Sequence, residues 1–258
     1  MAKNISRMDK IQTIKLPISI GILSWKSGQT LVDTLTTYYE NGIFEIANDI
    51  TILFQEFSEQ DYQIAKHFGL DSICLNNNVG IGKAFIRLTQ NAQTDNIMVL
   101  EHDWKLIENR ETTYQRLQSG IQLLDNGYSC VRYRHRKDPG YPHFSFKHMG
   151  HELDYYDDEL ECTSPHLLDS VHWLNPAESF PDKIQIDGEY FVSTSRWGNW
   201  TNNPCLYKKQ FYLDTVSEFA GDGIALEGNI SRWWAKQNYK VAHGEGLFKH
   251  IDLVKYGR

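Results

Sequence analysis

The chain has 258 residues, of which 41% are hydrophobic and 13% aromatic, as in a globular protein with a substantial core. Its net charge of −7 disfavours a nucleic-acid binder, because such proteins depend on many lysine and arginine contacts to phosphate. No apolar run reaches the roughly 18 residues of a membrane helix, and the polar N-terminus lacks a signal-peptide core. We therefore expect a soluble, cytoplasmic protein without a transmembrane segment.

Cysteines and basic residues point to no specific chemistry. Four cysteines, Cys74, Cys130, Cys162 and Cys205, lack the paired spacing of a zinc site and are predicted to be free thiols in a reducing compartment. The basic cluster at 132–137 could bind a local anion, and a solvated loop explains it equally well.

Strand and helix signals alternate through the first half of the chain. Apolar, β-branched runs predict four strands, at 18–25, 49–56, 71–75 and 96–100. Helical spacing predicts helices between them, at 27–42, 58–69 and 80–92, with Ser27 and Ser58 as N-caps. The alternation predicts an α/β fold with a mostly parallel sheet, in which ligands collect beyond the carboxyl ends of the strands.

The second half is less regular. Its patterns predict helices at 109–127 and 225–238, and strands at 128–134, within 183–195 and at 239–244, before a closing segment at 247–255. The long aromatic segment at 135–165 is weakly periodic, which is typical of a functional or mobile loop. Its three histidines at 143–152 do not match the spacing of known zinc motifs. We expect this segment to cover an acceptor or to be mobile.

The fourth predicted strand ends directly in Glu101, His102 and Asp103. Two carboxylates at a rigid strand end can share one divalent ion, since Mg²⁺ and Mn²⁺ prefer oxygen ligands and often take only one or two from the protein. The alternative is that Asp103 caps a turn and Glu101 is solvated.

The stretch from Asn76 to Trp104 resembles the central signature of GT-A fold glycosyltransferases, especially the large family-2-like group. Asn78-Val79-Gly80 opens a helix, as in that family, and Glu101-His102-Asp103 stands in the place of its DXD metal motif. Ala84 and Arg87 fall at the family's small and basic helix positions. The resemblance extends back to the first two strands and covers roughly residues 17–104.

The resemblance implies the domain organisation. Residues 17–258 would form a single catalytic domain of GT-A fold behind a polar N-terminal tail at 1–16. Within it, 17–104 would bind the nucleotide sugar and 105–258 the acceptor. The central sheet would be mostly parallel and flanked by helices, with an irregular acceptor-side half.

The resemblance also implies a metal-dependent glycosyltransferase. It would move a sugar from a nucleotide-diphosphate donor, with a UDP-sugar favoured over a GDP-sugar, to a hydroxyl of a glycan or other sugar acceptor. Mn²⁺ or Mg²⁺, held by Asp103 with Glu101 and His250, would neutralise the diphosphate leaving group. The alternative for His250 is a structural histidine.

The expected donor-binding residues follow the family pattern. They are Ser24, Trp25, Gln55, Glu56, Asn78, Gly80, Lys83, Arg87, Glu101 and His102. Lys83 and Arg87 could equally lie on a solvated helix face. Two departures leave the donor base open: Gln55-Glu56 stands where the family often has an aspartate for the base, and the first acid of the DXD place is a glutamate.

On the acceptor side, Glu227 is the expected catalytic base, with Asp222 second, because inverting family members carry an acid near the start of a late helix. A helix-start acid favoured by the macrodipole is the alternative for Glu227. Trp197, Trp200, Asn202 and Asn203 are expected to bind acceptor sugars, since a tryptophan offers a flat apolar face with a polar edge. The alternative is that both tryptophans belong to the core.

Two other functions remain open from the sequence. A sugar-phosphate nucleotidyltransferase shares the sheet and the metal, but it requires a glycine-rich basic loop after the first strand, where this chain has one lysine and one glycine. A non-catalytic carbohydrate-binding protein on a GT-A fold would bind sugar without metal or nucleotide.

Overall fold

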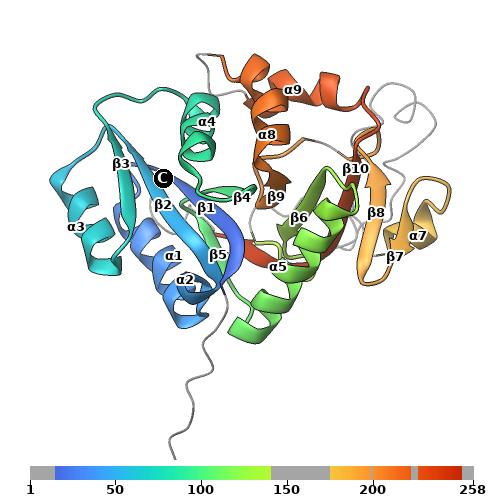
Figure 1. The fold of residues 1–258 in the computed structure, drawn as a ribbon, viewed down its shortest axis with the longest axis horizontal. Coiled ribbons are helices and arrows are strands. Elements are labelled where there is room, and N and C mark those ends of the chain that lie inside the picture. The colour runs from blue at the N-terminus through green and yellow to red at the C-terminus, as the bar shows by residue number, and fades with distance from the viewer. Residues whose placement is uncertain (1–14, 141–174, 199, 222–225, 252–258) are drawn as a thin grey trace, which may run out of the picture.

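The computed structural model describes residues 15–140, 175–198, 200–221 and 226–251 (Figure 1). The predicted loop at 135–165 lies outside these residues from 141 onward, including its histidine-containing part at 143–152, as do Cys162 and Asp222. Cys74, Cys130 and Cys205 are free thiols, as predicted.

The first half forms the predicted alternation of strands and helices. Its elements are β1 (Leu16–Trp25), α1 (Gly28–Glu40), α2 (Ile43–Ile46), β2 (Ala47–Gln55), α3 (Glu59–Phe68), β3 (Asp71–Leu75), α4 (Ile81–Asn91) and β4 (Asn96–Glu101). Ser58 caps α3 in a reciprocal capping box with Asp61. Ser27 precedes α1 but does not cap it, because its hydroxyl lies 2.6 Å from that of Ser24.

The second half contains the remaining elements. They are β5 (Trp104–Leu106), α5 (Arg110–Asp125), β6 (Cys130–Arg134), α7 (Pro176–Ser179), β7 (Gln185–Asp187), β8 (Tyr190–Thr194), β9 (Cys205–Lys208), α8 (Lys209–Val216), the 3₁₀ helix η3 (Ser217–Phe219), α9 (Leu226–Trp234) and β10 (Lys240–His250). The last strand is continuous where the sequence predicted a strand and a separate closing segment.

All strands join one sheet, in the order β3-β2-β1-β4-β9-β6-β10-β8-β7, with β5 paired to β10. The strands of the first half, β3, β2, β1 and β4, are parallel, as predicted. Among the described strands of the second half, β6 and β10 run parallel, while β9, β8, β7 and β5 pair antiparallel. The predicted α/β class is confirmed.

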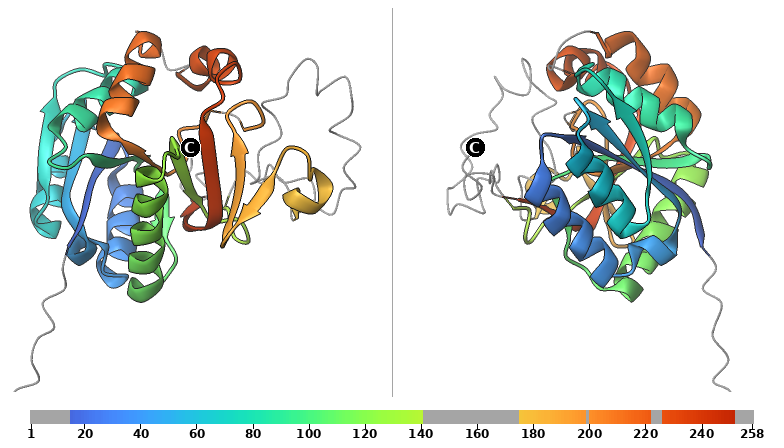
Figure 2. Two further views of the ribbon diagram at one scale, coloured as in Figure 1. Left: turned by 45° about the vertical axis from the view of Figure 1, so that its right-hand side comes forward. Right: turned by 90° about the vertical axis from the view of Figure 1, so that its left-hand side faces the viewer.

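Helices cover both faces of the sheet (Figures 1 and 2). Alternate residues of each buried strand point to opposite faces, so Met98 and Leu100 pack with α1, α2, α3 and α5. Ile97 and Val99 of the same strand pack with α4, α8 and α9. This double burial explains why β1, β2 and β4 are mostly apolar, whereas the edge strand β3 is largely exposed.

The register brings the carboxyl ends of three strands to one edge. Trp25 of β1 lies opposite Gln55 of β2, and Leu23 of β1 lies opposite Glu101 of β4. Residues that follow these strands therefore emerge side by side, which is where open parallel sheets bind ligands.

Candidate functional site

Asp103 and His250 form the centre of this edge. The chain turns after Glu101 and enters β5 at Trp104. Asp103 lies in this turn and is 5% exposed. β10 runs antiparallel to β5 with His250 opposite Trp104, and the Ile251 amide donates to the Asp103 carbonyl at 2.8 Å. His250 Nε2 thereby lies 3.3 Å from Asp103 Oδ2. Two residues 147 positions apart in the chain meet here.

The Asp103 carboxylate has an unused ligand atom. Oδ1 is buried and has no hydrogen-bond partner among the described residues. Burial would raise the pKa of Asp103, but the hydrogen bond to His250 and the nearby His102 outweigh it and lower that pKa below its usual value. A buried, ionised carboxylate with one unsatisfied oxygen is suited to a cation.

These residues fit the divalent ion that the fold family implies. In the described part of the chain, no group of three or more His, Cys, Asp or Glu side chains has metal-binding geometry. A pair is nevertheless sufficient for Mg²⁺ or Mn²⁺, which complete their shell with waters and phosphate oxygens. Asp103 and His250 would supply that pair.

Glu101 ends β4 beside this pair and is half-buried. Burial, together with the negative charges of Asp103 and Glu227, raises the pKa of Glu101 to about 8. The carboxylates of Glu101, Asp103 and Glu227 therefore share one region, although they come from β4, the turn after it and α9. Such a concentration of acids is costly in the absence of a cation.

Glu227 lies in the first turn of α9 and is exposed. The backbone amide of Asn202 donates to Glu227 Oε1 at 2.6 Å, which fixes the carboxylate. Among the described residues, no donor reaches Oε2. The structure thus brings the predicted base beside the predicted metal motif, through the segment expected to bind the acceptor.

Two residues that follow β1 and β2 at this edge have a left-handed backbone conformation. Lys26 and Glu56, the residues that follow β1 and β2, have φ values of 49° and 50°, and both are non-glycine residues. The Lys26 ammonium and the Trp25 indole N–H both reach Glu56 Oε2, at 2.5 and 3.1 Å. Trp25 remains 44% exposed. Sequence reasoning missed Lys26, although a local signal existed, because it stands directly after a strand end.

Other predicted donor residues are engaged within the protein. Ser24 is 1% exposed and bonded to Ser27, so it is removed from a bound ligand, and we correct that prediction. Gln55 is also buried, and its side-chain oxygen Oε1 accepts a hydrogen bond from the Val79 backbone amide at 2.7 Å. Asn78 Oδ1 accepts the amide of Gly80, whose φ of 83° suits the start of α4. Gln55 and Asn78 therefore shape the loop before α4.

Lys83, Arg87 and His102 are at least partly accessible to solvent. Lys83 and Arg87 are exposed, four residues apart on α4, and His102 is half-buried next to Asp103. Gly82 lets α4 approach the Ala220 backbone, where a Cβ on Gly82 would lie 2.8 Å from the Ala220 Cα. The start of α4 therefore lies beside the segment that leads to α9.

The two acceptor tryptophans differ. Trp200 is 2% exposed and packs against Tyr207, Tyr212 and Trp234, so the prediction that it faces a sugar is corrected: it is a core residue. Trp197 is partly exposed.

Trp197 and Asn203, also predicted to bind the acceptor, make contacts within the protein. Lys183 and Arg196 sit over the Trp197 ring, at 5.3 and 5.0 Å from its centroid. Asn203 donates its amide to Thr201 Oγ1.

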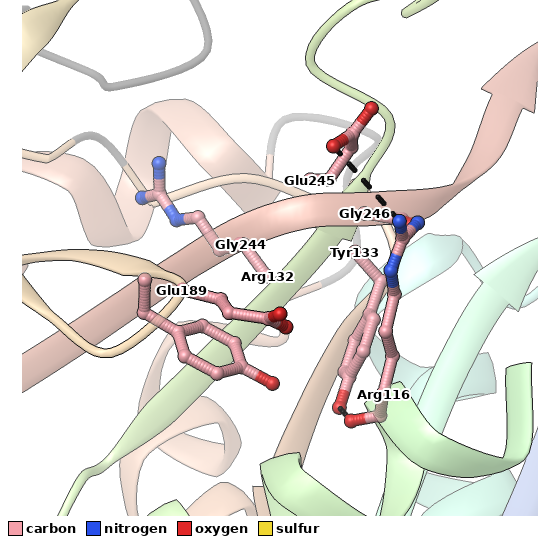
Figure 3. Close-up of a pocket in the computed structure, with 8 residues that line it drawn as sticks. Arg116, Arg132, Tyr133, Glu189, Gly244, Glu245 and Gly246 are labelled. Atoms are coloured by element: carbon pink, nitrogen blue, oxygen red, sulfur yellow. Dashed lines mark hydrogen bonds and ion pairs between the residues drawn. The ribbon is translucent and has the colours of Figure 1, made fainter. Parts of the chain in front are cut away.

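A cavity of about 190 Å³ lies elsewhere, between α5, β6, β8 and β10 (Figure 3). None of the predicted site residues lines it. Two of its charged groups are paired, with Arg116 bound to Glu108 at 2.9 Å and Glu245 to Lys137 at 2.7 Å. It is therefore separate from the carboxylates around Asp103.

Comparison with known proteins gives a structural match without a sequence match. No family model matches the sequence, and no curated protein sequence matches it either. Solved structures of S. aureus TarS 1-349 do match: at 12% identity over 93% of this chain, with a TM-score of 0.53, and in complex with UDP at 11% identity over 92%, with a TM-score of 0.55. The complex with UDP-GlcNAc matches at 11% identity over 92% of the chain, with a TM-score of 0.51.

These neighbours are GT-A glycosyltransferases. The chain has the GT-A fold. It spans 62% of the TarS chain in the first of these matches, so the whole neighbour is considerably longer. The Pyrobaculum calidifontis mannosyltransferase PcManGT, in complex with GDP-Man and Mn²⁺, overlaps 49% of the chain at 11% identity, with a TM-score of 0.40. No helix of the described residues is long and apolar enough to span a membrane.

Proposed function

We propose that this protein is a divalent-metal-dependent glycosyltransferase that uses a nucleotide-sugar donor. One observation carries the proposal: Asp103 presents a buried, unsatisfied oxygen next to His250, with Glu101 and Glu227 close by, at the ligand-binding edge of a GT-A sheet. This arrangement provides both a cation site and a carboxylate base. UDP-sugars are the first donors to test, because the TarS neighbour was solved with UDP-GlcNAc.

In the proposed reaction, Glu227 removes the proton from an acceptor hydroxyl. The hydroxyl oxygen bonds to the anomeric carbon of the donor sugar while the bond from that carbon to the diphosphate oxygen breaks, and the electron pair leaves with the diphosphate. A divalent ion, when bound, supplies positive charge to that leaving group. Asp103 and His250 would hold the ion, and the rigid strand end of β4 fixes Glu101 beside it.

In a single displacement the acceptor attacks the face of the sugar opposite the departing diphosphate, which inverts the anomeric centre. The amide of Asn202 holds one carboxylate oxygen of Glu227 and leaves the other to accept the proton. A general base of this kind contributes about 10²–10⁴-fold to a rate.

A thermal-shift panel tests the proposal. UDP, GDP, dTDP and CMP are each added with Mn²⁺, with Mg²⁺ or with chelator. A ligand at about 100 times its Kd adds about 2.7 kcal/mol, or a Tm rise of several degrees for a chain of this size. We expect one nucleotide to stabilise the protein only with metal. A sugar that stabilises it without metal or nucleotide would favour a carbohydrate-binding protein instead.

A further inference from the structure

The His250 ring packs against the Trp104 indole, which in turn contacts Arg134. Its imidazole packs on the Trp104 indole, with ring centroids 4.6 Å apart and an interplanar angle of 56°. On the same indole, the Arg134 guanidinium carbon lies 5.5 Å from the ring centroid. Trp104 and Arg134 are both 3% exposed. Trp104 therefore contacts both the buried Arg134 guanidinium at the end of β6 and the His250 ring next to Asp103.

Arg134 also reaches the His250 backbone. Its Nε donates to the Pro139 carbonyl at 3.1 Å, and the same carbonyl accepts the His250 amide at 3.2 Å. Gly140 pairs with His250 as an isolated bridge, and a Cβ on Gly140 would lie 2.0 Å from the His250 carbonyl oxygen. Side chain and backbone of His250 are thus positioned by one segment, residues 134–140, which we call the strap.

Hydrogen bonds and an ion pair join the strap to β10. The amides of His135 and Arg136 donate to the carbonyls of Phe248 and Glu245, each at 2.8 Å. Asp138 pairs with Lys249 at 2.8 Å. The strap contains most of the basic cluster noted in the sequence, so those charges are used within the protein.

We infer that Arg134 is a positioning residue for the metal pair: it fixes the Trp104 indole and the Pro139 carbonyl, and through them sets the His250 imidazole toward Asp103. This inference rests on the proposed function for its metal, but the ring placement itself exists in the metal-free protein. A desolvated guanidinium is attracted to the face of an indole, which favours the observed placement of Trp104. Residues that orient metal ligands typically change metal affinity by about 10–100-fold when they are replaced.

The strap supplies a matched control. Arg136 sits over the Phe191 ring, 4.2 Å from its centroid, and so makes the same kind of contact away from His250. Arg134→Met and Arg136→Met remove equivalent groups from neighbouring positions. The conservative variants Arg134→Lys and Arg136→Lys keep the charge and remove the guanidinium.

The first readout is the metal-free protein at fixed pH. In an NMR spectrum of the side-chain ring protons, the His250 signal should be displaced by the ring current of Trp104, and His250→Gln assigns it. We expect R134M to move this signal toward the position of an unstacked histidine and R136M to leave it in place. An unchanged signal in R134M overturns the inference, whatever the protein's function.

The second readout is Mn²⁺ affinity, measured by electron paramagnetic resonance of the free ion. We expect R134M to bind Mn²⁺ about tenfold more weakly than R136M, with R134K in between. Equal affinities in R134M and R136M overturn the inference. If R134M does not fold by circular dichroism, R134K against R136K decides by the same two readouts. If wild type binds no Mn²⁺ while the NMR signal responds to R134M, the proposed function fails and the positioning of His250 stands.

Discussion

The backbone amide of Asn202 donates a hydrogen bond of 2.6 Å to Oε1 of Glu227, joining the segment before β9 to the first turn of α9. This bond fixes the carboxylate next to Glu101, whose pKa responds to the charge of Glu227. The candidate base is therefore held by the backbone of the candidate acceptor segment, so acceptor binding and base orientation share one piece of chain.

Glu227→Gln should abolish most of the transferase activity and leave the donor site intact. The side-chain oxygen of the glutamine still accepts the hydrogen bond from the Asn202 amide, but the glutamine cannot take a proton. We therefore expect kcat to fall about 10²–10⁴-fold. The Kd for donor nucleotide with Mn²⁺ should stay within about twofold. Glu218→Gln, an exposed acid in η3, is the control and should retain activity. Normal turnover by E227Q would exclude Glu227 as the base.

Asp103→Asn should eliminate metal binding. The substitution keeps the size of the side chain and removes the charge that a cation needs, so the stabilisation by Mn²⁺ plus nucleotide should disappear from the thermal melt. The control is Asp95→Asn, an exposed residue just before the opposite end of β4, which should respond to metal as wild type does. A full metal response in D103N would contradict the assignment.

Stability of the metal-free protein should fall as pH rises from about 5 to about 8. The folded-state pKa of Glu101, about 8, exceeds its unfolded value, so between these values the folded protein binds more protons and loses stability with each increase in pH. Chemical denaturation in chelator at several pH values measures this slope. Glu101→Gln should flatten it, and saturating Mn²⁺ should reverse it, because the ion favours the ionised carboxylate. A slope that is unchanged by E101Q would show that other groups cause it.

Trp200→Ala should destabilise the fold by about 3–5 kcal/mol, since it empties a fully buried aromatic site among Tyr207, Tyr212 and Trp234. Urea denaturation measures the loss. Trp25→Ala, at a half-exposed tryptophan, should cost less than about 1 kcal/mol. If the two costs were equal, Trp200 would not be the core residue described here.

The first half of the fold could be predicted from sequence because its signals are local. Each buried parallel strand carries a mostly apolar run, and Gly42 and Gly69 mark helix ends with positive φ. The single strand β10 was predicted as two pieces because Gly244 and Gly246 interrupt its pattern. The short strand β5 forms only through pairing with β10, and no local pattern reveals it.

The sequence named candidate residues of the site, but their spatial arrangement depends on the fold. Glu101 and Asp103 are two residues apart in the sequence, but their meeting with His250 depends on the register of β10 against β5. Trp200 and Trp197 look alike in sequence, and only packing separates the core residue from the partly exposed one. The support of His250 by Arg134 could not be found from the chain alone, because it passes through Trp104 and Pro139.

The most direct test of the proposed metal site is an anomalous difference map at the manganese edge, from crystals grown with UDP and Mn²⁺. We predict one strong peak within roughly 2 Å of an Asp103 carboxylate oxygen, next to His250 and a diphosphate oxygen. UDP bound at the strand edge with no manganese peak at Asp103 would contradict the account.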